Sequence, residues 1–387
     1  MGFSFDEPIN PASLVSGNFS VQGHTSTFKL ATNSYNTYQG VVLDPSGLSP
    51  GNTYTALVQN VSDPYGNVMP QTSVPFTVGP VKWAETGVPI RPGQVIPVGD
   101  TGFDVLNGGR KEWDSYDEIT MAYVKKTNDF DVQVQVVMAE PGSEWTRVGL
   151  QARNGLDTDV GSASSNGTGA GTHSAYAQTH VNPNQTLGST GLWPSSDPIQ
   201  PGNPTPNNGH EQNTRLAAAA ATTGWGNNLA GAPSYPNVWL RLTRQGTNIH
   251  GMSSSDGKTW QDQGSVTLTD QKADMFVGPS LAVETGNIWT SGFDVWGPTD
   301  PGCTSICTFD PNYDRLWVAQ FRNFIDTPSL SIALVAGHPT ITFVGALQRA
   351  SAVTGPYADV AGAVSPYTVP AGQSAGFFRV RGTISPK

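Results

Sequence analysis

One acidic stretch has the residue types of a hydrolytic active site. It reads E-W-D-S-Y-D-E and spans residues 112–118. Two carboxyl groups about 5–5.5 Å apart can cleave a glycosidic bond, one as nucleophile and the other as acid and base. On a regular strand Glu112 and Asp114 would share a face, but Asp117 would fall on the opposite one. Two alternatives remain: Glu112, Asp114 and Asp117 are catalytic acids, or, as we favour, they are solvated or paired with arginine.

The histidines do not form a metal-binding pattern. His173 and His180 are seven residues apart, so on one strand they would face opposite sides. The sequence contains no H-x-H or H-E-x-x-H motif and no cluster of Cys and His, so no zinc or copper site is predicted.

Calcium is a separate case, because its oxygen ligands need no fixed spacing. Asp157 and Asp159 stand where a loop is expected to begin, and they are candidate ligands of a structural calcium ion. Turn-forming acids are the alternative. No other cofactor is predicted.

A long polar segment, residues 160–235, holds candidate ligand-binding residues. Trp193 and Trp225 lie in Gly- and Asn-rich surroundings without strand alternation, and an exposed indole can stack on a sugar ring. Tyr176 and His210 lie in the same segment, where Asn, Gln and Asp side chains can bond sugar hydroxyls. We therefore expect these four residues to bind a glycan. The alternative is that the loop tryptophans only cover the edge of a sandwich.

The two cysteines, Cys303 and Cys307, lie in the short motif P-G-C-T-S-I-C. A C-x₃-C pair alone lacks the further ligands of a metal site. We expect a small local disulfide, as in secreted proteins, and two free thiols are the alternative.

The composition is that of a turn-rich β protein. Charged residues make up 13% of the chain, well below the usual quarter, and the sequence holds 44 Gly and 30 Pro. The net charge of −10 and the lack of a basic stripe argue against nucleic acid as a partner. No apolar run is long enough for a membrane span. The first residues lack the features of a signal peptide and have the pattern of a strand, so we expect a part of a longer protein.

Short alternating segments separated by turn residues predict an all-β protein of three units. Residues 1–80 form the first unit, residues 91–298 the second and residues 313–387 the third, with linkers between them. The clearest pattern is the meander of residues 236–284, where apolar strands alternate with Gly-Thr-Asn and Ser-Asp-Gly-Lys turns.

The first unit resembles the bacterial Ig-like domains of the S-layer-protein (SbsA) type. The likeness depends on F-x-F-D-E-P-I-N-P-A-S, N-F-x-V and L-x-P-G-x-x-Y-x-x-x-V-x-x-V-x-D-x-x-G-N. Its residues are Phe5, Pro8, Leu14, Phe19, Leu48, Pro50, Tyr54, Val58, Val61, Asp63, Gly66 and Asn67. The resemblance implies an Ig-like β-sandwich that acts as a spacer, with these residues in core and turns.

The second unit resembles a concanavalin-like, laminin-G-like jelly roll of bacterial secreted proteins (the DUF1349 type). The shared pieces are W-D-x-x-D-E-x-x-x-x-Y, D-F-D-V-x-V-x-V, W-x-R-V-G-L-Q-A-R and, most specifically, W-L-R-L-x-R-x-G-x-x-x-x-G-x-x-S-x-D-G-x-x-W. The last is carried by Trp239, Arg241, Arg244, Gly246, Gly251, Ser255, Asp256, Gly257 and Trp260. The resemblance implies a two-sheet sandwich associated with carbohydrates, usually without catalysis. Arg241 and Arg244 should point to opposite faces, and one is expected to pair with Asp256 or Glu284.

The third unit resembles the small β-sandwich tails of bacterial surface and secreted proteins. Its motif is L-Q-x-A-x-x-x-x-G-P-Y-x-x-V-x-x-A-x-S-P-Y, ending in F-F-R-V. The matching residues are Leu347, Gly355, Pro356, Tyr357, Ser365, Pro366, Tyr367 and Phe378. The resemblance implies core and turn roles.

The sequence thus favours a non-catalytic module of an extracellular or cell-surface protein. The central jelly roll would bind a polysaccharide or other glycan, or mediate adhesion to other surface proteins. Two alternatives stay open: a glycoside hydrolase or polysaccharide lyase that uses the acids of residues 112–118, and a structural component of a fibre or surface layer.

Overall fold

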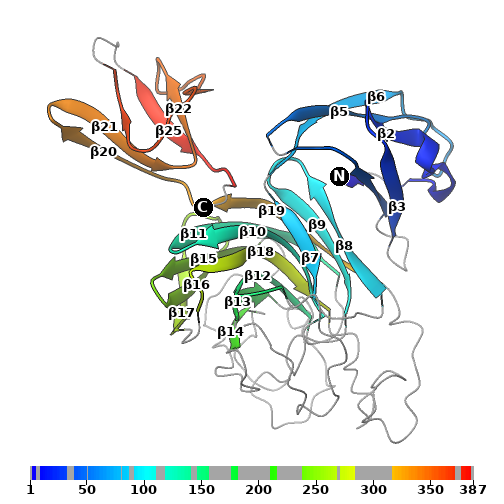
Figure 1. The fold of residues 1–387 in the computed structure, drawn as a ribbon, viewed down its shortest axis with the longest axis horizontal. Helices are drawn as coiled ribbons and strands as arrows, with labels where there is room; N and C mark the ends of the chain where they lie inside the picture. Colours follow the sequence, from blue (N-terminus) through cyan, green and yellow to red (C-terminus); the bar gives the residue numbers. More distant parts are fainter. Residues whose placement is uncertain are drawn as a thin grey trace, which may run out of the picture.

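The computed structural model shows a nearly all-β chain (Figure 1). It describes residues 2–5, 9–32, 39–49, 51–79, 81–86, 91–109, 118–140, 146–156, 176–181, 210–215, 238–267, 271–283, 316–370 and 376–384. Within these ranges the only helices are two single 3₁₀ turns, Pro11–Ser13 and Ser16–Asn18. The predicted all-β fold is confirmed.

The N-terminal unit consists of two three-stranded antiparallel sheets. One has the order β1-β4-β3 and the other β2-β5-β6. Their strands are β1 (Gly2–Ser4), β2 (Phe19–Val21), β3 (Ser26–Thr32), β4 (Gln39–Pro45), β5 (Thr53–Val58) and β6 (Thr72–Thr77). Leu14, Phe19, Val58 and Val61 lie in the core between the sheets, as their motif predicted. The Asp63 carboxylate accepts hydrogen bonds from the backbone N–H groups of Tyr65 and Asn67, so this part of the motif is a turn.

Two larger sheets form the central sandwich. The six-stranded sheet has the order β14-β13-β12-β18-β10-β7 and the seven-stranded sheet the order β17-β16-β15-β11-β19-β9-β8. The strands of the first are β7 (Lys82–Glu85), β10 (Thr120–Thr127), β12 (Arg147–Arg153), β13 (Tyr176–Val181), β14 (His210–Arg215) and β18 (Asp274–Ala282). Those of the second are β8 (Arg91–Val98), β9 (Gly102–Gly108), β11 (Phe130–Ala139), β15 (Val238–Gln245), β16 (Asn248–Ser254), β17 (Gln261–Thr267) and β19 (Trp317–Asp326).

Strand alternation builds the core of this sandwich. Each strand sends every second side chain inward, as with Val132, Val134 and Val136 of β11 and Val148 and Leu150 of β12. These residues are at most 1% exposed. The pattern leaves the other face of each sheet free to carry different chemistry.

The division into units differs from the sequence prediction at two strands. Residues 81–90 were expected to be a linker, but β7 is the edge strand of the six-stranded sheet. Residues 313–387 were expected to be a separate unit, but β19 lies in the seven-stranded sheet between β11 and β9. Both strands complete the sandwich by pairing with segments that are distant in sequence.

A buried ion pair joins the two sheets where β19 ends. Lys126 Nζ of β10 lies 2.6 Å from Asp326 Oδ1, and the two side chains are 0% and 4% exposed. The backbone N–H of Asp326 donates to the Thr383 carbonyl, so the end of the chain returns to the same place. Ile384 packs against the central core.

The C-terminal unit lies between β19 and this return. It has one sheet of order β20-β21-β24 and another of order β23-β22-β25. Its strands are β20 (Ser329–Val335), β21 (His338–Val344), β22 (Ala346–Ala350), β23 (Ala358–Asp359), β24 (Tyr367–Thr368) and β25 (Phe377–Arg381). Ile341, Phe343 and Leu347 form its core with Tyr367 and Phe378 beside them. At the other end, Val42 of the N-terminal unit packs on Ile96, Leu106 and Val318 of the sandwich.

Two neighbouring lysines offer a matched test of the buried pair. We expect Asp326→Ala to lower the free energy of unfolding by about 3–5 kcal/mol, because it leaves the Lys126 charge in the core. Lys125 Nζ is also 2.6 Å from a carboxylate, Asp274 Oδ2, but both side chains are about half exposed. Asp274→Ala should therefore cost much less, because an exposed ion pair contributes little to stability.

Urea unfolding followed by tryptophan fluorescence measures both variants. All 10 tryptophans lie between residues 83 and 317, so this signal reports on the central region. Equal losses in the two variants would contradict a special role of the buried pair.

Candidate functional site

The outer face of the six-stranded sheet carries a concentrated set of polar side chains. On β12, Val148 and Leu150 face the core, so Arg147, Gln151 and Arg153 belong to the outer face. All three are at most 1% exposed. Arg153 Nη1 donates to Gln151 Oε1 at 3.1 Å, and Arg153 Nε donates to the Gly155 carbonyl at 2.6 Å.

The neighbouring strand β13 continues this set. Ala177 and Val181 lie in the core, which places Tyr176, Gln178 and His180 on the outer face. The register sets Gln178 beside Gln151 and Tyr176 beside Arg153. The Arg153 guanidinium carbon is 5.9 Å from the centre of the Tyr176 ring. Gln178 Nε2 donates to Ser280 Oγ of β18 at 3.4 Å, so three strands share one polar surface.

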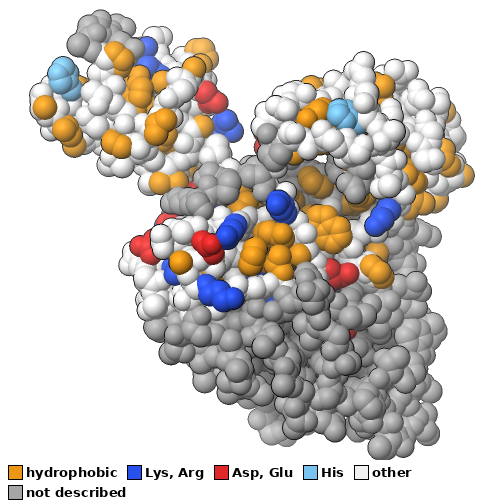
Figure 2. All heavy atoms as spheres, in the orientation of Figure 1, with side chains coloured by type: hydrophobic (Ala, Val, Ile, Leu, Met, Phe, Trp, Pro, Cys, Tyr) orange, Lys and Arg blue, Asp and Glu red, His pale blue; other side chains and the backbone are white. Residues whose placement is uncertain are grey.

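One row across this face alternates cationic and aromatic side chains. Lys125 of β10 pairs with Phe276 of β18, Phe276 pairs with Arg153, and Arg153 pairs with Tyr176. Neighbouring strands lie roughly 4.8 Å apart, so these four side chains follow one another across the sheet. We call this set the cation–aromatic row. Figure 2 shows hydrophobic side chains gathered on the central sandwich with Lys or Arg side chains beside them.

The β10 end of the row is open to solvent. Phe276 and Tyr123 are partly exposed and meet edge to face, with ring centres 5.3 Å apart. Burial raises the pKa of the Tyr123 hydroxyl, so it stays a neutral hydrogen-bond donor at ordinary pH. The other end, at Arg153 and Tyr176, is buried. The row therefore leads from a solvent-facing aromatic pair to buried hydrogen-bonding groups.

Gly149 makes room in this face between His180 and Ser280, with which it pairs. A Cβ at this position would come within 2.7 Å of His180 Cβ and 2.9 Å of Gln178 Nε2. These side chains therefore lean over the glycine, and any larger residue there would displace them.

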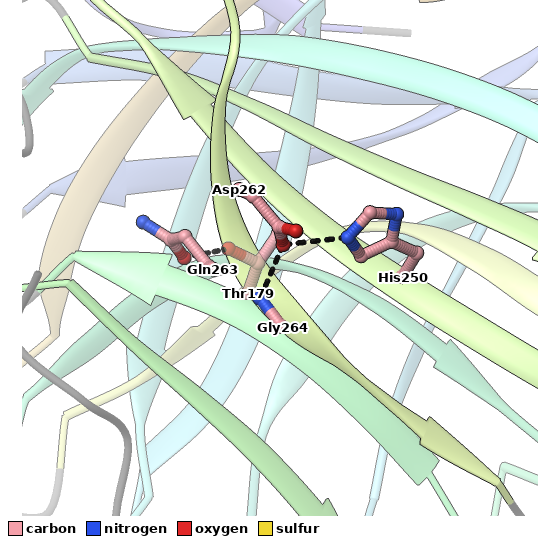
Figure 3. A network of polar contacts seen from close by, with 5 residues as sticks. All are labelled: Thr179, His250, Asp262, Gln263 and Gly264. Carbon is pink, nitrogen blue, oxygen red and sulfur yellow. Dashed lines mark hydrogen bonds and ion pairs between the residues drawn. The ribbon is translucent and has the colours of Figure 1, made fainter.

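A second polar cluster, drawn in Figure 3, has a structural role. The register of β16 and β17 shifts beside Gly251, and Asp262 and Gln263 point to opposite sides of the strand, as consecutive residues do. Asp262 Oδ1 accepts hydrogen bonds from the Gly264 N–H and from His250 Nε2, each at 2.6 Å. The Gly264 N–H, more than His250, lowers the pKa of Asp262. Gln263 Oε1 accepts a hydrogen bond from Thr179 Oγ1 at 2.8 Å and so joins the two sheets.

The tryptophan motif of residues 239–260 is also scaffold. Asp256 accepts the backbone N–H groups of Lys258 and Thr259, which lowers its pKa and fixes the turn. Gly257 has a φ of +68°, and a Cβ there would reach within 2.8 Å of the Trp239 ring. Only glycine fits both conditions.

The two arginines of this motif have other partners than expected. Arg241 pairs with Asp131 and lies over the Trp260 ring, 5.4 Å from its centre. Arg244 donates to the carbonyls of Gly246 and Ala273 on the opposite face. The expected pairing with Asp256 is therefore wrong, because the turn already uses that carboxylate. The other expected partner, Glu284, lies outside the described residues.

Most residues singled out from the sequence lie outside the described ranges. They are Glu112, Asp114, Asp117, Asp157, Asp159, Trp193, Trp225, Cys303 and Cys307. Tyr176 is described, and it lies on the outer face and is 1% exposed. His210 begins β14, and its backbone position pairs with Val181. Glu118 ends the acidic stretch and is 2% exposed.

Sequence reasoning missed Gln151, Arg153, Gln178 and His180 as members of one site. The signal was present, because R-V-G-L-Q-A-R and Y-A-Q-T-H-V each place polar residues at every second position. What the sequence lacked was the register that brings the two strands together.

Two carboxylates, Glu85 of β7 and Glu118 just before β10, lie near each other. Burial raises the pKa of the Glu85 carboxyl, and the negative charge of Glu118 adds to this, while the hydrogen bond from the Gly93 N–H opposes it. Nearby, Asn107 Nδ2 donates to the Glu118 carbonyl and to Thr120 Oγ1, both at 3.1 Å. Among the described residues no group of three His, Cys, Asp or Glu could hold a metal ion. In the same ranges no helix is long and apolar enough to cross a membrane.

The Glu85 pKa leads to a test. Because the folded-state pKa is raised, the native protein holds this proton more tightly, and stability falls as pH rises through that pKa. We expect Glu85→Gln to raise the melting temperature at pH 7 and to have no effect near about pH 3.5, where the carboxyl is protonated in both states.

Asp274→Asn is the control of opposite sign. The hydrogen bond from Lys125 lowers the pKa of Asp274, so this variant should lose stability at pH 7 and not at low pH. A Glu85→Gln variant that is destabilised equally at both pH values would show that the raised pKa has no energetic consequence.

Comparisons with known proteins add little to this geometry. No protein-family model matches the chain, and no curated protein matches it. One solved structure, described as "The crystal structure of a functionally unknown protein from Saccharomyces cerevisiae", is similar at 15% identity with a TM-score of 0.37. The alignment covers 65% of this chain and 98% of the yeast one.

Proposed function

We propose that the chain is a carbohydrate-binding module of an extracellular or cell-surface protein. Its binding surface is the solvent-exposed part of the outer face of the six-stranded sheet, around Tyr123, Lys125 and Phe276. The cation–aromatic row is the observation that carries this proposal. Lys125, Phe276, Arg153 and Tyr176 stand side by side on four adjacent strands, and Gln151 and Gln178 form the next row.

The chemistry of this face suits a sugar chain. An aromatic ring stacks on the apolar face of a pyranose, and Tyr123 and Phe276 offer two partly exposed rings in contact. The Tyr123 hydroxyl beside these rings can both donate and accept, as sugar hydroxyls require. A rigid sheet fixes the spacing of these groups, so little side-chain entropy is lost on binding.

The exposed cation on this face, Lys125, favours an acidic glycan. Arg147 and Arg153 are buried, so the cation that a ligand on this face can reach is Lys125, whose side chain is about half exposed. An ammonium group donates charge-assisted hydrogen bonds to a carboxylate. The chain as a whole carries a net charge of −10, so this preference depends on local contacts rather than on long-range attraction.

Affinity electrophoresis in gels containing alginate, pectate, xylan or laminarin tests the proposal. We expect retardation in the acidic gels and weakening by salt. Phe276→Ala should reduce affinity by about three- to tenfold through the loss of stacking. Tyr123→Ala, at the other partly exposed ring, should also reduce it, by a similar factor.

Gln135→Ala is the matched control, because Gln135 belongs to the other sheet of the same sandwich, where its side chain accepts a hydrogen bond from Asn323. It should leave retardation unchanged. Failure of every polysaccharide to retard the wild-type chain, with or without calcium, would refute the binding proposal. Release of reducing ends that disappears in Glu112→Gln would instead support the enzymatic alternative.

A further inference from the structure

Strand β20 is an edge strand with an exposed apolar sequence. It stands at the end of the order β20-β21-β24, and all seven of its residues, S-L-S-I-A-L-V, are exposed. Leu330 is 39% exposed, Ile332 62%, Leu334 75% and Val335 56%. The strand contains no charged residue and no proline, and its pairing with β21 has no register shift. It therefore lacks the usual features that keep sheet edges from pairing.

Leu330, Ile332 and Leu334 lie on the face of the β20-β21-β24 sheet that also carries the core of the C-terminal unit. Leu330 pairs with Phe343, and Ile332 pairs with Ile341, and both partners are buried in the core of the C-terminal unit. Paired residues share a face, so Leu330, Ile332 and Leu334 extend that core beyond the cover of the second sheet. The apolar surface of this small sandwich is thus incomplete at β20.

The main chain of β20 also has groups available for pairing. Leu334 lies opposite Pro339, which has no N–H, and the Phe343 N–H opposite Leu330 donates to Ser365 Oγ. The pairs Leu334–Pro339 and Leu330–Phe343 are therefore the antiparallel pairs that do not exchange main-chain hydrogen bonds. By alternation, the N–H and C=O groups of Leu330, Ile332 and Leu334 point toward the free edge.

We propose that β20 pairs antiparallel with β20 of a second copy of this chain, about a two-fold axis through Ile332. The sequence is self-complementary around that residue. Leu330 would lie opposite Leu334, Ile332 opposite Ile332, and Ser331 opposite Ala333, with no charge facing a like charge. The pairing forms about six main-chain hydrogen bonds. Such an isologous contact closes after two copies and gives a dimer rather than a fibre.

The contact is smaller than a standard protein–protein interface. The four apolar side chains expose roughly 400 Å² per copy, about half of what each partner buries in an interface of standard size. We therefore expect a reversible dimer, with a Kd on the order of 10–100 µM.

Sedimentation equilibrium of the full chain over a range of concentrations is the experiment. The wild type should fit a monomer–dimer equilibrium. Ile332→Lys should raise the Kd at least about tenfold, because two lysines would meet at the axis. Val364→Lys is the matched control, since Val364 lies in the same unit, is 74% exposed and is outside β20. It should leave the Kd unchanged.

Ile332→Pro distinguishes main-chain pairing of two β20 strands from non-specific hydrophobic association. It removes an N–H that faces solvent in the monomer, so an edge strand tolerates it, yet it deletes hydrogen bonds from the dimer. We expect it to weaken the dimer while the melting temperature of the monomer stays the same. The proposal is overturned if the wild type stays monomeric up to about 500 µM. It is also overturned if the Kd of the dimer is the same in the wild type and both Ile332 variants, or if larger assemblies form without a dimer.

Discussion

The central sandwich depends on the place of β19 in the seven-stranded sheet. This strand lies between β11 and β9, so without it the sheet would fall into two pieces. Its residues Trp317, Phe321 and Phe324 also fill the core. Two ion pairs hold it in place: Arg322 with the buried Asp104 of β9, and Asp326 with Lys126 of the opposite sheet. In the sequence, β19 comes after all the other strands of the sandwich. The core is therefore complete only when the chain up to residue 326 has folded into place.

The same constraint explains where polar side chains can gather. Each strand gives one face to the core, and only the other face is free to vary. On β12 and β13 that free face holds Gln151, Arg153, Gln178 and His180 rather than small or apolar residues. Burying four such groups costs free energy unless their hydrogen bonds are satisfied, so the contacts between Arg153 and Gln151 and between Gln178 and Ser280 stabilise the face as well as order it. These contacts hold the buried side chains of this face in one arrangement.

Sequence patterns predicted what is local and missed what is distant. Core positions such as Leu14 and Phe19, and the Asp63 turn, follow from periodicity and turn chemistry within a few residues. The all-β class follows from the same signals. The roles of β7 and β19 could not be derived, because their partners are set by long-range pairing. The polar cluster on the outer face was not predicted for the same reason. Alternation shows that Gln178 and His180 share a side, but only the register with β12 shows what lies beside them.

The edges of the sheets show why β20 stands apart. The edge strand β8 contains Pro92 and Pro97 and a register shift, and β17 carries a bulge at Gln263. The edge strand β25 has Arg379 and Arg381 on its exposed positions. Each of these features hinders pairing with another chain. β20 has none of them and instead exposes apolar side chains beside unpaired main-chain groups. Compared with β8, β17 and β25, β20 is a long, uncharged edge strand, and this difference is what the proposed pairing of two copies uses.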